Sequence, residues 1–285
     1  MMQCVVIVPV YADQLSRSER ASFRQTLSVL HNHDIVIVTH SACNLEEYQK
    51  IAETTGKDFA VELFDPSYFS SVESYNDLCY SSEFYLRFQT YTYMLICQLD
   101  VWVFSDQLVY WCNKGYDYIG APIYHAYTPK RFTTKFLGIG NGGFSLRKIA
   151  HCLSMTTAPK HLPFVHPCEL IRFYWNLGRY TDAFTRHPLK RILIIPTVLG
   201  KIFGLHNTLH FYTSRHINED LIFGSWSNHS WGHHAIIPDE TEASRFSFEV
   251  NPSMLYQRNH NNLPFGCHAF MKWEYDSFWS QFINL

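Results

Sequence analysis

Residues Tyr91–Phe104 read YTYMLICQLDVWVF and are almost entirely apolar or aromatic, with a single carboxylate, Asp100, inside the run. A continuous apolar run rich in β-forming residues predicts a strand buried on both faces of a sheet. Burying an ionised carboxylate is costly without a compensating charge or metal, so we expect Asp100 where the strand ends and a cleft begins. Ligands bind at that edge in open α/β sheets. The alternative is that Asp100 caps a turn between two strands.

Strands and helices alternate ahead of this run. Short apolar runs predict strands over Cys4–Val10, Asp34–Thr39 and Phe59–Phe64, and the segments between them carry apolar residues at helical spacing. The first helix follows Ser16 and Glu19, which have the spacing of a capping box. This order predicts an α/β fold with a mostly parallel sheet, right-handed crossovers and flanking helices.

The chain on either side of Asp100 predicts three further elements. We expect one helix over Ser71–Gln89, a short helix over Asp106–Asn113, and a strand over Tyr116–Pro122 that stops at its proline. No glycine-rich dinucleotide fingerprint follows the first strand, and no phosphate-binding P-loop pattern occurs. The sequence therefore argues against a dinucleotide site or a P-loop enzyme.

Composition sets the broad class. The 285 residues are 47% hydrophobic and 17% charged, which is typical of an ordered globular protein, and the net charge of −2 argues against a nucleic-acid partner. Eight cysteines without a CxxC pair, and a start without a signal-peptide pattern, lead us to expect free thiols and a cytoplasmic location. No run approaches the roughly 18 apolar residues of a membrane span. The stretch Ile192–Phe203 predicts a buried helical segment, and contact with a membrane surface is the alternative.

Three motifs in the second half carry candidate chemistry. Gly138–Phe144 is rich in glycine, which lets another molecule approach the backbone or lets the chain turn; a simple hairpin or bulge is the alternative. Glu219 and Asp220 stand at the head of an apolar segment, where acids also suit a helix N-terminus. His268 follows the turn Pro264–Gly266, and a solitary histidine is more often a packed or surface residue.

These motifs resemble, in kind and order and over almost the whole chain, those of a nucleotide-sugar-dependent glycosyltransferase of the GT-A fold. The motifs are Pro9-Val10-Tyr11, Gln98-Leu99-Asp100, Gly140-Asn141-Gly142-Gly143-Phe144, Asn218-Glu219-Asp220 and Pro264-Phe265-Gly266-Cys267-His268. The chain looks most like an uncharacterised, mostly bacterial family of predicted glycosyltransferases. The resemblance implies one GT-A-like domain over 1–285 with a Rossmann-related mixed sheet. Its nucleotide-sugar-binding half would be 1–122 and its acceptor-side, catalytic half 123–285.

The resemblance also implies roles for individual residues. Those it assigns to donor binding are Pro9, Val10, Tyr11, Asn76, Gln98, Asp100, Gly142 and Gly143. Asp100 and His268 would hold a divalent metal, Mn²⁺ or Mg²⁺, which neutralises the leaving diphosphate. Gln98 stands where such enzymes usually carry a first acid, so it adds no charge. Asp220 would be the general base of an inverting transfer, with Glu219 beside it as an acceptor-binding group.

The expected function is transfer of a sugar from a nucleotide-sugar donor to a hydroxyl acceptor, in glycan or polysaccharide assembly, with retaining chemistry left open. A non-catalytic nucleotide-sugar- or glycan-binding protein on the same fold is the alternative; Gln98 favours it, and Asp220 and His268 oppose it. A zinc hydrolase built on the histidine-rich stretch Asn228–His234 is a third candidate without supporting ligand spacing. Peripheral contact with the inner face of a membrane and the oligomeric state stay open.

Overall fold

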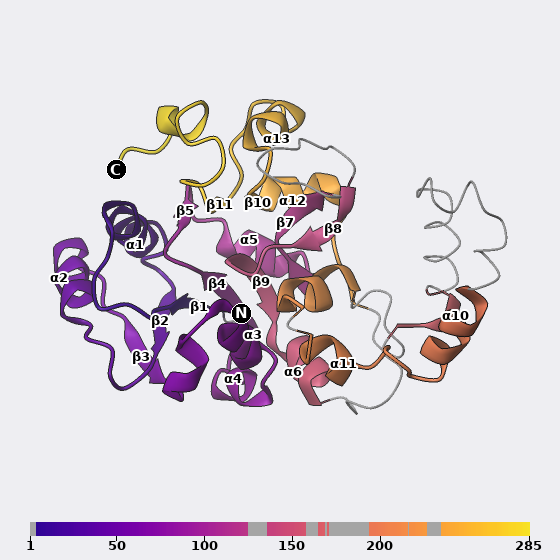
Figure 1. The fold of residues 1–285 in the computed structure, drawn as a ribbon. Coiled ribbons are helices and arrows are strands. Elements are labelled where there is room, and N and C mark those ends of the chain that lie inside the picture. The colour runs from indigo at the N-terminus through magenta and orange to yellow at the C-terminus, as the bar shows by residue number, and fades with distance from the viewer. Residues whose placement is uncertain are drawn as a thin grey trace.

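The central sheet mixes parallel and antiparallel strands. The computed structural model describes residues 4–124, 136–157, 165–168, 170, 194–215, 217–226 and 235–285. Six strands lie in the order β3-β2-β1-β4-β9-β6 (Figure 1). Parallel pairing joins β1 (Cys4–Pro9), β2 (Asp34–Thr39), β3 (Ala60–Leu63) and β4 (Tyr93–Cys97), whereas β9 (Phe144–Lys148) runs antiparallel to β4 and to β6 (Tyr118–Ile119). The predicted α/β fold with a mainly parallel sheet and flanking helices is confirmed.

Side chains of β1 alternate between the two faces of the sheet, as a strand buried on both sides requires. Val6 and Val8 pack in one apolar cluster with residues of α1 (Arg17–Val29), α2 (Glu46–Thr55) and α5 (Leu108–Asn113). Val5 and Ile7 pack in a second cluster with residues of α3 (Val72–Cys79), α4 (Ser82–Arg87) and α6 (Ile149–Thr157). Helices therefore cover both faces.

The predicted capping box at the start of α1 is confirmed. The Ser16 hydroxyl accepts from the Glu19 backbone amide, and the Glu19 carboxylate accepts from the Ser16 amide at 2.8 Å. The helix between β2 and β3, α2, begins at Glu46. The Asn44 side-chain oxygen accepts from the Glu46 amide at 2.9 Å and so ends the preceding loop.

The single strand expected over Tyr91–Phe104 is wrong. A turn at Gln98–Asp100 divides the run into β4 and β5 (Val101–Val103), and β5 belongs to a separate three-stranded sheet with β10 (Ser247–Phe248) and β11 (Gly266–His268). Both β4 and β5 are buried, so the residues of the run are apolar on both sides of the turn, and its composition does not indicate where the turn lies.

Two other expected elements also divide. The helix over Ser71–Gln89 is two helices, because the Ser81 hydroxyl accepts from the Phe84 amide and starts α4 anew. The strand over Tyr116–Pro122 is β6 followed by β7 (Ala121–Tyr124), and it does not stop at its proline. Pro122 is tolerated inside β7 because, among the described residues, that strand pairs on one side only, with β8 (Phe136–Gly140).

The remaining elements lie mostly in the second half of the chain. They are η1 (Pro66–Phe69), α10 (Ile194–Ile202), α11 (Leu209–Thr213), the π-helical turn η2 (Leu221–Trp226), α12 (Glu240–Phe246), α13 (Pro252–Arg258) and η4 (Trp279–Gln281). The prediction of a buried segment at α10 is wrong for Leu199, which is half exposed. Phe203, which follows the helix, is 84% exposed. In the described parts of the chain, no helix has the length and apolar character needed to cross a membrane.

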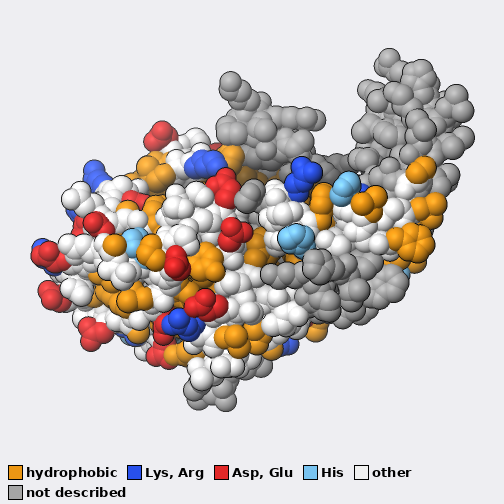
Figure 2. All heavy atoms as spheres, turned by 60° about the horizontal axis from the view of Figure 1, so that its bottom comes forward, with side chains coloured by type: hydrophobic (Ala, Val, Ile, Leu, Met, Phe, Trp, Pro, Cys, Tyr) orange, Lys and Arg blue, Asp and Glu red, His pale blue; other side chains and the backbone are white. Residues whose placement is uncertain are grey.

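Aromatic side chains pack the C-terminal segment against the second sheet. Trp102 of β5, Phe248 of β10, and Phe270 and Trp279 from the C-terminal segment lie in one buried cluster. On the face drawn in Figure 2, acidic and basic side chains are interspersed over the described surface and are not gathered by sign.

Candidate active site

Asp100 lies in the tight turn that joins β4 to β5, at the edge where the parallel strands β1 and β4 end. Val101 N donates to Gln98 O (3.1 Å), which closes the turn, and Gln98 N donates to Gly143 O (2.9 Å). The Asp100 side chain is 47% exposed. Asp100 therefore stands in a turn between two strands and also at the edge of the sheet where α/β proteins bind ligands.

His268, at the end of β11, lies between two carboxylates. Its Nε2 atom is 3.2 Å from Asp100 Oδ1, and its Nδ1 atom is 3.3 Å from Glu249 Oε1. Burial lowers the pKa of His268, but the two carboxylates outweigh burial and raise that pKa to about 10. Burial in turn raises the pKa of Asp100, and the charge of His268 more than offsets this and lowers it. The imidazole is thus a cation at neutral pH here. No sequence signal singled out Glu249.

Gly142 and Gly143 have neighbours too close for any side chain. A Cβ atom at Gly142 would lie 2.5 Å from Glu219 Oε1, and one at Gly143 would lie 2.2 Å from His268 Nε2. Asn141 takes a positive φ of 75°, and its side-chain oxygen accepts from the Gly143 amide (3.1 Å). The flanking strands β8 and β9 lie in different sheets, so the alternative of a simple hairpin is wrong. The close approach that requires glycine here is made by the protein's own side chains.

Asp220 precedes η2 and is held by two backbone amides. Its Oδ2 atom accepts from Asn141 N (2.7 Å), and its Oδ1 atom accepts from Leu221 N (2.7 Å). Burial, followed by the neighbouring charge of Glu219, raises the pKa of Asp220 to about 7. A carboxylate with a pKa near neutral can exchange a proton with a substrate hydroxyl at neutral pH.

Side chains from distant parts of the chain meet at the loop Asn141–Gly143. The predicted site residues that contact it are Gln98, Glu219, Asp220 and His268. Consecutive Cα atoms are 3.8 Å apart, so these contacts are spread over at most about 8 Å of backbone. Asp220 and His268 therefore both contact this loop, and Asp100 lies beside it because it contacts His268. These are the three residues to which the resemblance assigns catalytic or metal-binding roles.

Glu219 is buried against an arginine. It is 3% exposed, and its Oε1 atom is 2.5 Å from Nη2 of Arg147, which is fully buried. Arg147 also donates to the Tyr85 hydroxyl (3.4 Å) and to Gly142 O (3.3 Å). Glu219 thereby helps to fix the glycine loop, and its role as an acceptor-binding group stays a prediction. No feature of the strand sequence FSLRK singled out Arg147 as the partner of Glu219.

The segment Pro9–Tyr11 ends β1 beside β4. Pro9 and Val10 are buried, whereas the Tyr11 ring is 64% exposed. Partial burial, then the charges of Glu19 and Asp100, raise the pKa of the Tyr11 phenol. Tyr11 therefore stands near Asp100, with a ring face open to solvent.

Two other predictions fall elsewhere. Asn76 on α3 donates through Nδ2 to Asn218 Oδ1 (3.2 Å), which places it beside the segment that carries Asp220. The histidine-rich stretch Asn228–His234 lies outside the described residues, so the structure does not test the zinc-hydrolase candidate.

Asp100 and His268 fit a divalent ion by their spacing. An octahedral ion with ligand bonds of about 2.0–2.3 Å places adjacent ligand atoms about 3 Å apart, close to the observed 3.2 Å. Gln98 Oε1 lies within 2.7 Å of where a Gly143 Cβ would be and offers a third, uncharged oxygen. Among the described residues, no group of three or more His, Cys, Asp or Glu side chains could hold an ion. Two protein ligands completed by substrate phosphate and water are common for Mg²⁺ and similar ions.

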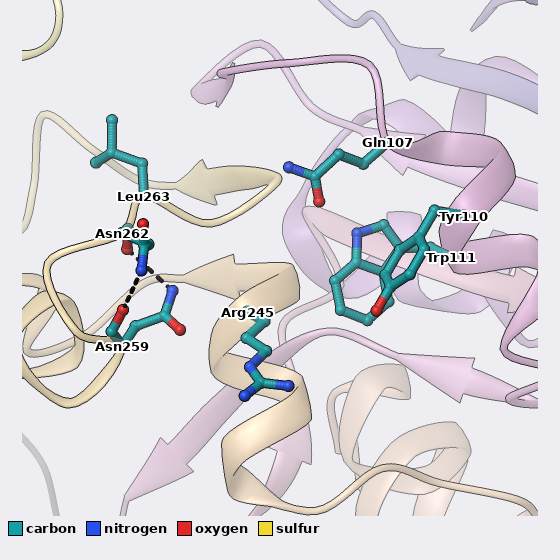
Figure 3. Close-up of a pocket in the computed structure, with 7 residues that line it drawn as sticks. All are labelled: Gln107, Tyr110, Trp111, Arg245, Asn259, Asn262 and Leu263. Carbon is teal, nitrogen blue, oxygen red and sulfur yellow. Dashed lines mark hydrogen bonds between the residues drawn. The ribbon is translucent and has the colours of Figure 1, made fainter.

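A separate pocket of about 430 Å³ contains none of the predicted site residues (Figure 3). It is lined from α5, from α12 and from the turn after α13. β11 follows this turn and ends at His268.

The family model described as "Protein of unknown function (DUF5672)" matches residues 58–268. The chain belongs to this family. The match includes Asp100, the loop Asn141–Gly143 and Asp220, and it ends on His268, so the DUF5672 region spans the gathered site. The expected kinship with a mostly bacterial family stays a prediction. A search of the curated proteins found no match.

Solved structures similar to this DUF5672 chain include three glycosyl-transferring proteins. Core-mannan synthase A of Aspergillus fumigatus, in a form with Mn and GDP, is 8% identical with a TM-score of 0.39, and the match covers 53% of this chain and 60% of that one. A glycosyltransferase involved in glycosylation of the PBCV-1 major capsid is 9% identical with a TM-score of 0.36 and 96% coverage of each chain. Mouse xyloside xylosyltransferase 1, apo form, is 11% identical with a TM-score of 0.44, covering 94% of this chain and 97% of that one. At these scores the likenesses do not by themselves assign an activity.

Proposed function

We propose that this protein transfers a sugar from a nucleotide-sugar donor to a hydroxyl of a glycan acceptor, with inversion at the anomeric carbon. The observation that carries the proposal is the meeting of Asp220, His268 and Gln98 at one glycine loop, with Asp100 against His268. A candidate base, Asp220, and one member of a candidate cation-binding pair, His268, therefore contact the same short loop. Glycosyl transfer needs both, because a proton must leave the acceptor as charge builds on the departing diphosphate.

The donor would lie along the edge where β1 and β4 end. The exposed ring of Tyr11 can stack on the nucleotide base, and the backbone of Gly142 and Gly143 can lie against the donor sugar. Asn76 would act on the donor only through its contact with Asn218. Lys272 stands close enough for its charge to lower the pKa of Asp100, and it adds a cation for the diphosphate that sequence reasoning missed.

In the proposed reaction the acceptor hydroxyl gives its proton to the Asp220 carboxylate. The hydroxyl oxygen forms a bond to the anomeric carbon as the bond from that carbon to the diphosphate breaks, and the electron pair leaves with the diphosphate. Asp100, His268 and the Gln98 carbonyl would hold a divalent ion, which supplies Lewis-acid neutralisation of the leaving group when bound. His268 must release its proton to serve as a ligand.

The test is release of nucleoside diphosphate from a panel of nucleotide sugars, with and without Mn²⁺ and with neutral oligosaccharide acceptors. The proposal requires acceptor-dependent release and a new glycosidic product. Binding of a nucleotide sugar without release, under every donor and acceptor combination, would contradict it.

The second candidate is a non-catalytic nucleotide-sugar- or glycan-binding protein. One observation favours it: His268 already has two carboxylates beside it, and Gln98 brings no charge, so tight metal binding must displace a stabilised proton. The raised pKa of Asp220 favours the enzyme. The same release assay distinguishes the two.

A further inference from the structure

The pocket drawn in Figure 3 contains a buried hydrogen-bond donor without a partner. Trp111 of α5 is 1% exposed, and its indole Nε1 has no hydrogen-bond partner among the described residues. Figure 3 shows this nitrogen on the side of the ring toward Gln107, which lines the same pocket. A buried N–H group without a partner is unfavourable, and a ligand oxygen that reached it would satisfy it.

Three carboxamides supply acceptors to the same space. Gln107 Nε2 donates to the Ser105 hydroxyl (2.9 Å). Asn259 Nδ2 donates to the Asn262 backbone carbonyl (2.9 Å), and Asn262 Nδ2 donates to the Asn259 backbone carbonyl (3.0 Å). Gln107 and Asn259 each donate one of their two amide hydrogens inside the protein, so each can offer a ligand its side-chain oxygen and its second N–H group.

An aromatic ring stands at the opening of the pocket. Tyr110 is 51% exposed and packs edge-on against Trp111, with ring centroids 5.0 Å apart. The apolar C–H face of a sugar ring packs on such a surface, while its hydroxyls both donate and accept hydrogen bonds. The volume of about 430 Å³ lies within the range of small-molecule sites.

The charges around the pocket argue against an anionic ligand. Arg245 lines it, but the Arg245 guanidinium is 3.0 Å from Glu242, which also pairs with Lys114 (3.2 Å). The three carboxamides are neutral, and the Arg245 charge is offset by Glu242, so the described lining gives an anion no net positive charge. A neutral hydroxyl-rich ligand satisfies both the acceptors and the Trp111 donor.

We infer that this pocket binds a neutral pyranose unit of an oligosaccharide. It is a second site, separate from the glycine loop, because β11 runs between them: Leu263 lines the pocket ahead of the strand, and His268 ends it. Three strand residues alone span about 7–10 Å. The inference goes beyond the proposed transfer and holds whether or not the protein is catalytic.

The test uses cellotetraose and mannotetraose as neutral probes and tetragalacturonate as an acidic one, with the full chain labelled with ¹⁵N and without nucleotide sugar. The indole N–H signal that disappears in Trp111→Phe identifies Trp111. A neutral probe is expected to shift this signal, and Tyr110→Ala is expected to weaken its binding by about tenfold or more. Val109→Ala, on the same helix and 57% exposed but outside the pocket, is the matched control and should bind as the unaltered chain does.

Three results would overturn the inference: no shift of the Trp111 signal with either neutral probe, unchanged affinity in Tyr110→Ala, or binding of the acidic probe alone. Tyr110 is exposed, so its variant tests the pocket even if Trp111→Phe folds poorly. No donor is present, so failure of the transfer assay leaves this result unaffected.

Discussion

His268 Nε2 lies 3.2 Å from Asp100 Oδ1, although Asp100 directly precedes β5 and His268 ends β11, far apart in the DUF5672 region. The antiparallel pairing of these strands aligns His268 with Val101, the residue after Asp100. The register between β5 and β11 therefore decides whether the Asp100 and His268 side chains can share an ion.

Asp100→Asn should weaken Mn²⁺ binding at least about tenfold, because a charged hard ligand becomes a neutral one. Titration calorimetry with Mn²⁺ in the presence of nucleoside diphosphate measures this. Asp77→Asn, an exposed carboxylate on α3, is the control and should leave the affinity unchanged. Equal Mn²⁺ affinities for Asp100→Asn and the unaltered chain would remove Asp100 from the metal site.

Asp220→Asn should lower kcat by about 10²–10⁴-fold, because an amide cannot take the acceptor proton. Donor affinity, measured separately by calorimetry, should change little. Glu53→Gln, on the exposed side of α2, serves as the control for loss of one carboxylate. Near-normal kcat in Asp220→Asn would exclude this residue as the base.

The pH dependence should follow the Asp220 pKa of about 7. Below that value kcat/KM should fall about tenfold per pH unit, because the base is protonated, and above it the rate should level off. The free energy of unfolding should change with pH in the opposite direction to kcat/KM. The folded-state pKa exceeds the ordinary 3.8, so the stabilisation from this group declines as pH rises from about 4 to 7. A kcat/KM profile that is flat between pH 5 and 8 would contradict the assignment.

Gly143→Ala should destabilise the fold by about 1–3 kcal/mol, because its Cβ would lie 2.2 Å from His268 Nε2 and 2.7 Å from Gln98 Oε1. Thermal unfolding measures the loss, and transfer activity should fall with it. Gly200→Ala in α10 is the control glycine, since its nearest neighbour, Leu205, leaves 3.2 Å. Equal melting temperatures for both variants would show that the loop yields to a side chain.

Arg147→Met should cost about 3–5 kcal/mol, because it leaves the Glu219 carboxylate buried without its partner. The double variant Arg147→Met with Glu219→Gln should recover part of that loss, since no buried charge remains. Chemical denaturation of the single and double variants measures the coupling. Additive losses would mean that the pair does not act as a unit.

Local patterns were sufficient for the first sheet strands and their helices. The apolar runs of β1 and β2 and the capping box at Ser16 are short-range signals, so the chain around them carries what is needed to predict them. The turn at Gln98–Asp100 was not predicted because both flanking strands are buried and apolar. The run therefore lacks the cluster of polar residues, glycine and proline that marks most turns.

The sequence by itself determined the parallel α/β core, the exposed edge expected for Asp100, and the residue types available for chemistry, because periodicity and side-chain chemistry are local properties. Only the tertiary structure decided that Asp220 binds the Asn141 amide, that Glu219 is buried against Arg147, and that Glu249 completes the surroundings of His268. It also placed Trp111 and Asn262 in one pocket. These contacts depend on strand register and helix packing between segments far apart in the chain, which no local pattern encodes.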